Sequence, residues 1–349
     1  MAIVAVGLSG GVDSSVTAAM MVEAGHDVIG LSMRLYDAPE KSGKSCCSPD
    51  DLFDARHVAD QLDIPFYVLN FTEVFKQTVI DPWAEGYRAG RTPNPCIRCN
   101  AIVKFRALTA RADALGADAL ATGHFAKVAE VDGQWRLGRA ANRIKDQSYF
   151  LYPIPVDRLP KFWLPLAELT KEEVRQRADA LGLPTADKSE SQDACFVTPN
   201  PPHVVVRRLT GEDPGAGQIV DENGRVLGEH KGFDAYTVGQ RRGLGMPGGP
   251  WYVVRVRPDS NEVVVRHGGV AVTEEVELMD MHWHIDEAPQ RVGVKLRSRG
   301  EPVTAELLPE AGGRARLLFP EPVARPAPGQ VAVAYDDQDW VVAGGVISA

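Results

Sequence analysis

Two cysteines lie three residues apart in the segment TPNPCIRCN, at positions 96 and 99. The C-x-x-C spacing serves zinc sites, redox disulfides and iron–sulfur clusters, and it can also present one reactive thiol beside an inactive one. The chain has five cysteines among 349 residues, too few for a disulfide scaffold. In a reducing compartment, spaced cysteines are more often catalytic or metal-binding. The pair therefore marks a candidate site whose chemistry its spacing leaves open.

A second candidate is the segment GLSGGVDSS at residues 7–15, which follows the apolar run IVAVG. Glycines let backbone amides point into a turn, and the first turn of a helix adds partial positive charge. Ser9, Ser14 and Ser15 would add hydroxyl donors, and Asp13 is placed to hold a magnesium ion against phosphates. The segment matches neither the Walker A loop nor the dinucleotide fingerprint. Because a plain strand–helix turn needs only one glycine and one cap, this density of useful residues predicts a phosphate-binding loop.

The elements that would hold these residues alternate between strands and helices in the first half of the chain. Apolar runs predict strands at 3–7, 28–33, 65–70 and 118–123, and helical spacing predicts helices at 13–25, 51–63, 73–88, 101–115 and 169–183. Thr170 and Glu173 can form a capping box at the last of these helices. This order predicts an α/β fold with a doubly wound parallel sheet covered on both faces.

The second half of the chain has a different pattern, in which short alternating runs are separated by Gly and Pro turns. PNPP at 199–202 interrupts the chain, Asn223 and Gly224 indicate a hairpin, and the runs 251–257 and 262–267 flank another. From residue 270 the alternation suits a small antiparallel barrel or sandwich. We therefore divide the chain into an α/β domain, a small central α+β domain and a C-terminal antiparallel β-barrel, at 1–199, 200–269 and 270–349.

Composition and charge limit the function. No apolar run of about eighteen residues exists, and the N-terminal residues indicate a buried strand rather than a signal peptide, so we expect a cytoplasmic protein without a membrane partner. The formal net charge of −9 argues weakly against polyanionic partners. Basic residues are nevertheless grouped, and a local basic face is enough to bind nucleic acid. The groups are Arg88, Arg91, Arg98, Lys104 and Arg106; Arg241 and Arg242; and Lys295, Arg297 and Arg299.

The phosphate loop and five further stretches together resemble a known family. SGGVDSS is similar to the pyrophosphate loop (PP-loop) of ATP pyrophosphatases, which split ATP to AMP and pyrophosphate and adenylate a carbonyl oxygen. With the other stretches, the chain resembles the bacterial tRNA-specific 2-thiouridylases over essentially its whole length. The resemblance implies an adenine nucleotide alpha hydrolase-like fold and an ATP-dependent transferase that replaces the 2-carbonyl oxygen of the wobble uridine with sulfur. The other stretches are GRTPNPCIRCN (90–100), ATGHFA (121–126), KDQSYFLY (145–152), ESQDACF (190–196) and YTVGQRRGLG (236–245).

By motif position, the resemblance implies that Cys99 is the nucleophile and that Cys195 carries persulfide sulfur. Adenylation turns the uridine oxygen into a good leaving group, and a persulfide is a strong enough nucleophile to replace it. Cys99 would then release the product or the sulfur through a Cys99–Cys195 disulfide. Arg91 and Arg98 would supply the positive charge that activates a thiol near Cys99.

The same matching implies contacts with ATP and with tRNA. Magnesium would accompany ATP at Asp13. The sulfur would come from a cysteine desulfurase, a sulfur-relay protein or free sulfide. The implied ATP contacts are Gly7, Leu8, Ser9, Gly10, Gly11, Val12, Asp13, Ser14, Met33 and Gly123. The implied tRNA contacts are His124, Lys145, Asp146 and Gln147, with Arg297, Ser298 and Gln330 touching the anticodon stem-loop from the C-terminal barrel.

Position 96 departs from the best-known form of the family, in which an aspartate with an acid–base role stands in place of Cys96. Glu190 and Asp193 are candidate substitutes. The cysteine also completes a set of three thiols, and related sulfurtransferases hold a [4Fe–4S] cluster with one open iron on such a set. We favour the persulfide mechanism and keep as the alternative a cluster on Cys96, Cys99 and Cys195.

Other sites and functions stay open at this stage. A zinc site is disfavoured because structural zinc needs four ligands, which Cys46 and Cys47 would have to complete. Another PP-loop enzyme acting on a small molecule would not need the β-rich C-terminal third. A non-catalytic tRNA-binding protein would not need an intact SGGVDSS and both catalytic cysteines.

Overall fold

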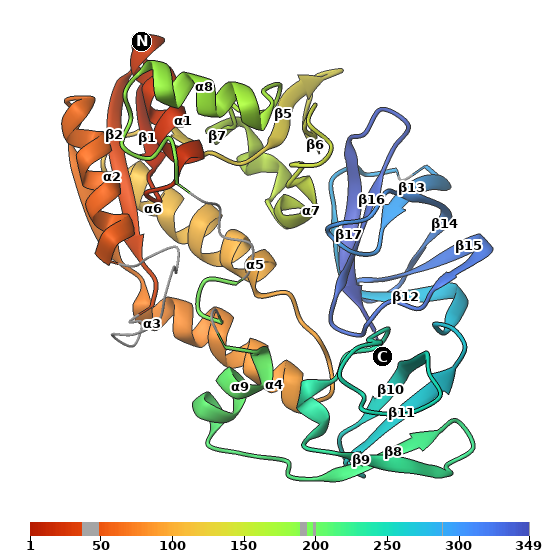
Figure 1. Cartoon of the computed structure of the whole chain (residues 1–349). Helices are drawn as coiled ribbons and strands as arrows, with labels where there is room; N and C mark the ends of the chain where they lie inside the picture. Colours follow the sequence, from red (N-terminus) through yellow and green to blue (C-terminus); the bar gives the residue numbers. More distant parts are fainter. Residues whose placement is uncertain (37–48, 189–193, 198–199, 288, 349) are drawn as a thin grey trace. The chain divides into compact units, whose positions relative to one another are not determined.

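The computed structural model describes residues 1–36, 49–188, 194–197, 200–287 and 289–348 (Figure 1). The chain forms two compact units. The first consists of Met1–Val79, Pro95–Pro199 and Gln338–Val341, and the second of Ile80–Asn94, Asn200–Asp337 and Val342–Ala349.

A parallel sheet in the order β3-β2-β1-β4-β7 forms the centre of the first unit. Val4, Ala5 and Val6 on the central strand β1 are fully buried, as expected for a strand covered on both faces. The strands predicted from the apolar runs are present, and the short β7 was not predicted. The bounds are β1 Ile3–Gly7, β2 Asp27–Arg34, β3 Phe66–Asn70, β4 Ala119–Ala121 and β7 Phe162–Trp163.

Helices cover both faces of this sheet. Val4 and Val6 share one apolar cluster with residues of α1 (Val12–Glu23), α2 (Pro49–Gln61) and α8 (Lys171–Ala180). Gly7 points to the opposite face, since side chains alternate along a strand, and Leu108 is among the nearest side chains there. Leu108 belongs to an unbroken helical segment made of α5 (Pro95–Arg98), η2 (Cys99–Leu108) and α6 (Thr109–Ala114).

This helical segment begins earlier than the predicted 101–115. Proline suits the first position of a helix, where its missing N–H is not needed, and the segment starts at Pro95. Cys96 and Cys99 therefore lie in its first turns, three residues apart and on one face. The helix predicted at 73–88 is present as a second continuous helical segment, made of α3 (Thr72–Phe75), η1 (Lys76–Ile80) and α4 (Asp81–Arg88).

Further elements complete the first unit. The hairpin of β5 and β6 was not predicted, although its turn residues Asp132 and Gly133, both with positive φ, are a known hairpin signal. The predicted capping box of Thr170 and Glu173 begins α8. The remaining bounds are β5 Ala126–Val131, β6 Gln134–Arg139, α7 Ser148–Leu151 and η3 Val156–Lys161.

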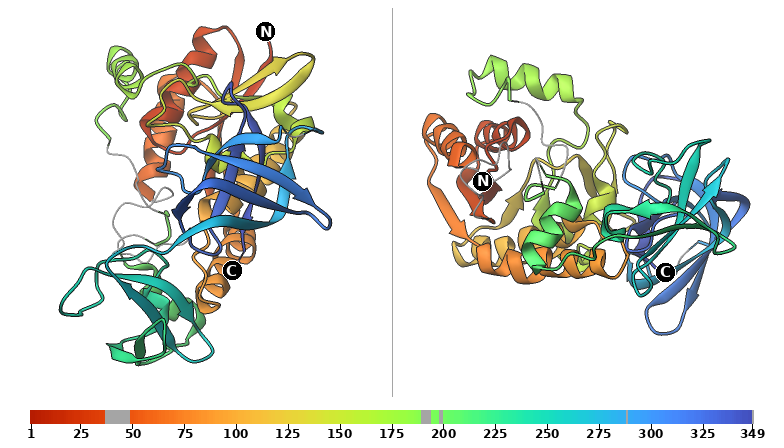
Figure 2. Two further views of the ribbon diagram at one scale, coloured as in Figure 1. Left: turned by 90° about the vertical axis from the view of Figure 1, so that its right-hand side faces the viewer. Right: turned by 60° about the horizontal axis from the view of Figure 1, so that its bottom comes forward.

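The second unit contains the two β structures that the sequence predicts. The sheet β10-β11-β8-β9 holds both predicted hairpins, with β11 and β8 joined in parallel. The strands after residue 270 form a closed barrel in the order β12-β15-β14-β13-β16-β17, drawn in blue in Figure 2, rather than a sandwich. Ala315, Leu317 and Phe319 alternate into its core.

The bounds of the second unit complete the fold. The helices are α9 Pro202–Thr210 and η4 Phe233–Ala235. The sheet strands are β8 Gly217–Asp221, β9 Val226–His230, β10 Trp251–Arg257 and β11 Glu262–His267. The barrel strands are β12 Val272–Trp283, β13 Arg291–Lys295, β14 Val303–Glu310, β15 Arg314–Ala324, β16 Val331–Tyr335 and β17 Val341–Ile347.

Candidate active site

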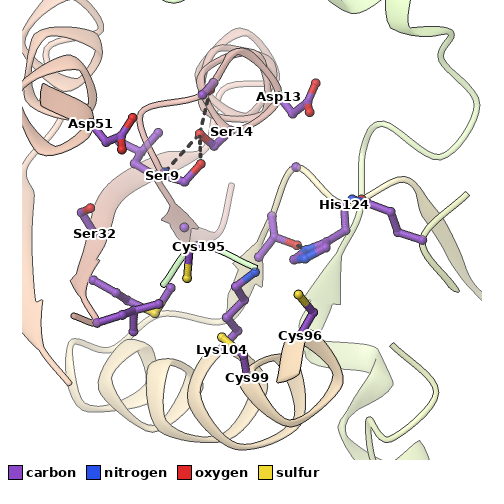
Figure 3. A pocket seen from close by; sticks show the side chains of 18 of the residues that line it. Ser9, Asp13, Ser14, Ser32, Asp51, Cys96, Cys99, Lys104, His124 and Cys195 are labelled. Carbon is purple, nitrogen blue, oxygen red and sulfur yellow. Dashed lines mark hydrogen bonds between the residues drawn. The ribbon is translucent and has the colours of Figure 1, made fainter. Parts of the chain in front are cut away.

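One pocket of about 370 Å³ in the first unit is lined both by the predicted phosphate loop and by the cysteines (Figure 3). It opens at the carboxyl ends of β1, β2 and β4, where open α/β sheets bind their ligands. The predicted site residues that line it are Gly7, Leu8, Ser9, Gly11, Val12, Asp13, Ser14, Met33, Cys96, Cys99, Gly123, His124, Lys145, Gln147 and Cys195.

The hydroxyl of Ser14 holds the phosphate loop in shape. It accepts a hydrogen bond from the Ser9 amide at 3.1 Å, donates to the Gly11 carbonyl at 2.9 Å and lies 3.2 Å from Ser9 Oγ. Ser15 was expected to face a ligand, and this expectation is wrong. Its hydroxyl is buried, donates to the Gly11 carbonyl and accepts from Thr185 Oγ1 at 2.9 Å.

Two glycines let other segments approach the loop closely. A Cβ on Gly10, which has φ +73°, would lie 2.1 Å from the Asp51 carbonyl oxygen. Gly10 was predicted to contact ATP, but it is not among the residues that line the pocket. A Cβ on Gly123, just beyond β4, would lie 2.7 Å from the Asp13 carbonyl carbon and 2.8 Å from the Ser14 amide nitrogen. Gly10 therefore allows α2 to pack on the loop, and Gly123 allows β4 to do so.

A buried lysine that the sequence did not indicate is paired with the loop carboxylate. Lys171 Nζ donates to Asp13 Oδ1 at 2.6 Å, and the Lys171 side chain is 7% exposed. Lys171 lies at the first position of α8, which packs against α1. No local sequence signal connects the two residues, because the contact depends on how α8 packs.

Other lysines give the pocket wall a positive charge. Lys104, Lys145 and Lys188 line it together with Lys171. Lys188 Nζ also donates to Asp51 Oδ1 at 2.6 Å, which ties the chain after α8 to the start of α2.

Arg98, one of the two arginines expected beside Cys99, is directed elsewhere. Arg98 is exposed and its Nε donates to the Thr78 carbonyl at 2.8 Å, while Arg91 belongs to the second unit. The charged group that Figure 3 shows rising from the cysteine-bearing helical segment into the pocket is Lys104.

The three cysteines Cys96, Cys99 and Cys195 line one pocket. Cys99 is 7% exposed, and Cys96 and Cys195 are half-buried. Among the described residues, which include all three, no group of three His, Cys, Asp or Glu side chains has the arrangement to hold a metal ion. The alternative of a cluster on Cys96, Cys99 and Cys195 stays a prediction. The structural questions about Cys46, Cys47, Glu190 and Asp193 fall outside the described residues.

His124 is neutral in this pocket. Burial lowers the pKa of its imidazole well below the usual 6.5, and the positive charge of Lys104 acts in the same direction. Thr122 Oγ1 lies 2.8 Å from His124 Nδ1, and the ring packs near Phe105 with 5.5 Å between centroids. A neutral imidazole can hydrogen-bond a ligand through Nε2 without adding charge.

The lowered pKa of His124 makes folding sensitive to acid. The unfolded chain binds the proton more readily, so this contribution to stability is complete above about pH 6.5 and is lost as the pH falls below it. His124→Asn removes the titrating group. Between pH 6.5 and 5.5 we expect the free energy of unfolding of the native protein to fall by up to about 1 kcal/mol more than that of the variant. Urea unfolding at both pH values measures this, with His57→Asn at an exposed position as the control. Equal losses for native protein and His124→Asn would contradict the assignment.

Some of the remaining predicted tRNA contacts are accessible, and others are held by contacts within the protein. Arg297 is exposed and Ser298 is half-buried in the turn after β13, so both leave surface for a ligand. Gln330 Nε2 donates to the Thr92 carbonyl within the second unit. Asp146 was predicted to contact tRNA. Its side chain is instead fully buried and forms an ion pair with Arg139 Nε at 3.3 Å.

Comparison with known proteins gives a family match along the chain. Residues 2–199 match the family described as tRNA methyl transferase HUP domain, 204–267 the tRNA methyl transferase PRC-barrel domain, and 273–347 the aminomethyltransferase beta-barrel domain. The fold and site thus define a HUP-domain protein followed by two β domains.

Two relatives named tRNA-specific 2-thiouridylase MnmA cover nearly the whole chain. The relative from Carboxydothermus hydrogenoformans is 44% identical over 99% of this chain and 97% of its own length. The one from Geobacter metallireducens is 46% identical over 99% of this chain and 96% of its own length. The chain belongs to the tRNA-specific 2-thiouridylase family, which confirms the resemblance seen in the sequence.

Solved structures include a more distant neighbour. A 4-thiouridine synthetase–RNA complex with bound ATP is 18% identical, with a TM-score of 0.40 over 60% of this chain and 50% of that chain. In the described part of the chain, every helix is too short or too polar to cross a membrane.

Proposed function

We propose that the protein is an ATP-dependent tRNA-uridine 2-sulfurtransferase acting on the wobble uridine. The observation that carries the proposal is the lining of one pocket by both the phosphate loop and the Cys99 and Cys195 thiols. Activation of an oxygen by ATP and its replacement by sulfur require both groups at one carbon atom. The names of the relatives supply the substrate class, and a tRNA substrate implies a cytoplasmic enzyme.

ATP is assigned to the loop side of the pocket. The amides between Leu8 and Gly11 and the start of α1 suit phosphate oxygens, and Met33 at the end of β2 offers apolar surface to the adenine ring. Magnesium is bound in such sites by one or two carboxylates together with substrate phosphates, and Asp13 provides one. Because Asp13 pairs with Lys171, magnesium would enter with the nucleotide, and Lys171 would then be available to the phosphates.

Sulfur transfer is assigned to the two cysteines. The terminal sulfur of a persulfide on Cys195 attacks C2 of the adenylated uridine, and AMP leaves with the former carbonyl oxygen. The Cys99 thiolate then attacks Cys195 Sγ, which breaks the sulfur–sulfur bond to the base and releases 2-thiouridine. A Cys99–Cys195 disulfide remains, and an external dithiol must reduce it before the next cycle. The donor of the persulfide is a cysteine desulfurase or a sulfur-relay protein. Free sulfide supplies it only by attacking the Cys99–Cys195 disulfide at Cys195 Sγ, which leaves a persulfide on Cys195 and a thiol on Cys99.

The three segments 1–199, 200–269 and 270–349 divide this work. The first carries the chemistry, the second is a small central connecting domain, and the third binds the anticodon stem-loop. Arg297 and Ser298 are assigned to that contact because both are accessible. His124, Lys145 and Gln147 are assigned to the part of the tRNA that enters the pocket.

A thiolation assay tests the function. Unmodified tRNA is incubated with the protein, ATP, magnesium, and either a cysteine desulfurase with cysteine or free sulfide. Thiolated uridine retards tRNA in a mercury-containing gel, so we expect a retarded band that depends on ATP. Absence of this band with both donors and competent tRNA would reject the proposal. An ATP-consuming reaction on a small molecule would then be the remaining alternative.

Cys96→Ser tests the mechanism. The persulfide route needs only two thiols, so we expect thiolation to fall by less than about tenfold in iron-free protein purified in air. Loss of a general acid or base would cost at least about a hundredfold. A cluster ligand would likewise be indispensable, with the activity following bound iron. The measurement is the initial thiolation rate together with the iron content, and a loss beyond a hundredfold would contradict the two-thiol route.

A further inference from the structure

The segment Gln338–Val341 between β16 and β17 belongs to the first unit, although Asp337 and Val342 on either side belong to the second. Within it, Trp340 is 9% exposed and bridges to Gly138 on β6. A Cβ on Gly138 would lie 2.6 Å from the Trp340 ring, so only glycine admits this contact. The ring also receives Lys127 and Arg136 at 5.6 and 5.8 Å from its centroid. The segment is thus firmly packed on the β5–β6 hairpin.

Asp339, the neighbour of Trp340, binds Arg139 at the end of β6 and Arg143 beyond it. Its carbonyl oxygen accepts from the Arg139 amide at 3.0 Å, and its Oδ1 accepts from Arg139 Nη1 at 3.0 Å. Its other carboxylate oxygen accepts from Arg143 Nη2. The Asp339 carboxylate helps raise the pKa of Arg139, against the effect of burial. Asp339, whose side chain is 34% exposed, therefore sets the position of a guanidinium that is itself 6% exposed.

Arg139 in turn contacts Asp146, which holds the backbone of a loop in the pocket wall. Its Nε donates to Asp146 Oδ2, while Asp146 Oδ1 accepts from the amides of Ala140 and Ser148 at 3.2 and 3.1 Å. The buried Asp146 thereby closes residues 140–148 into a fixed loop. Its two neighbours in sequence, Lys145 and Gln147, line the pocket.

Gln147 is joined in turn to the strand end that bears His124. Its side-chain oxygen accepts a hydrogen bond from the Phe125 backbone amide at 2.9 Å, and its backbone amide donates to the Phe125 carbonyl at 2.7 Å. A continuous set of contacts therefore runs from Asp339 through Arg139 and Asp146 to the wall that carries Lys145.

We infer that Asp339 is a positioning residue for the pocket: it acts through Arg139 and Asp146 to hold Lys145 and Gln147 where the polynucleotide substrate enters. The inference rests on the proposed function for its substrate and extends it to a residue near the C-terminus. The turn that carries Asp339 belongs to the first unit and continues along the chain into the barrel strands β16 and β17.

Asp339→Asn is the variant of choice, because asparagine keeps the shape and tolerates the positive φ of 66° at this position. Asp337→Asn, exposed in the same turn, is the matched control. The first measurement uses no substrate: hydrogen exchange of peptides that cover residues 139–150. We expect exchange of the Ala140 and Ser148 amides to accelerate by about tenfold in Asp339→Asn and to stay unchanged in Asp337→Asn. Unchanged exchange in Asp339→Asn would overturn the inference, whatever the protein's activity.

The second measurement is thiolation kinetics. We expect the KM for tRNA to rise by about fivefold or more in Asp339→Asn, while the KM for ATP stays within twofold. In a double-mutant cycle, Asp339→Asn should raise the KM for tRNA less in the Lys145→Ala protein than in the native protein, because part of the effect of Asp339 passes through Lys145. Fully additive losses, or equal losses for ATP and tRNA, would indicate a merely structural role and reject the inference. If the native protein thiolates no tRNA, the proposed function fails, and the exchange experiment still decides on the positioning contact.

Discussion

Cys195→Ser will abolish both persulfide loading and tRNA thiolation, whereas Cys99→Ser will abolish thiolation and keep the loaded sulfur. Removal of a nucleophile that forms a covalent intermediate typically lowers the rate by a thousandfold or more. Serine keeps the size of the side chain, so the pocket that both residues line should keep its shape. The two variants therefore separate acceptance of sulfur at Cys195 from release of the product by Cys99.

Labelled sulfur makes this difference measurable. The protein is loaded with a cysteine desulfurase and ³⁵S-cysteine, and bound label is read on a non-reducing gel beside the thiolation rate. Filter binding of tRNA and transfer of α-³²P label from ATP to tRNA, both measured on protein without loaded sulfur, serve as internal controls and should persist in each variant. Thiolation by Cys195→Ser, or loss of bound label in Cys99→Ser alone, would contradict the assigned roles.

Gly123→Ala will lower ATP affinity by at least about tenfold and will also destabilise the fold. The added Cβ would lie within 2.8 Å of the backbone at Asp13 and Ser14, closer than any real Cβ contact. Because the obstructing atoms are backbone, no side-chain rotation relieves the contact, and the phosphate loop itself must move. Overpacking of this kind typically costs about 1–3 kcal/mol of stability.

Calorimetric titration with ATP and magnesium measures the affinity, and thermal unfolding measures the stability. Gly228→Ala is the matched control, since its φ is ordinary and a Cβ there would meet nothing within 4 Å. Its ATP affinity should equal that of the native protein. Native ATP affinity in a folded Gly123→Ala protein would show that the loop tolerates displacement, and would remove Gly123 from the nucleotide site.

The sequence predicted those features whose causes are local. The SGGVDSS turn, the alternation of strands and helices, the capping box at Thr170 and the hairpins of the second unit all depend on neighbouring residues, and all are present. The position of Lys171 against Asp13 depends instead on the packing of α8 on α1, which no single segment encodes.

The direction in which a side chain points from a helix was harder to predict than the presence of the helix. Ser15 was grouped with Ser9 and Ser14 by composition, yet one helical step turns its hydroxyl into the core toward Thr185. Arg98 was chosen by its proximity to Cys99 in sequence, but the helical segment beginning at Pro95 turns it outward and directs Lys104 into the pocket. The role that we infer for Asp339 depends on its contact with Arg139, which lies 200 residues away in the sequence, so no local pattern indicated it.

The shared pocket has a further consequence for the fate of an activated base. An adenylated uridine is prone to hydrolysis, and its lifetime in water would limit any enzyme that had to pass it between two places. Because the phosphate loop and the thiols of Cys99 and Cys195 line a single cavity, the activated carbon would be consumed where it forms. Fidelity would then depend on order of arrival: sulfur must already be loaded on Cys195 when ATP is spent, and a chain that adenylates without loaded sulfur would waste nucleotide.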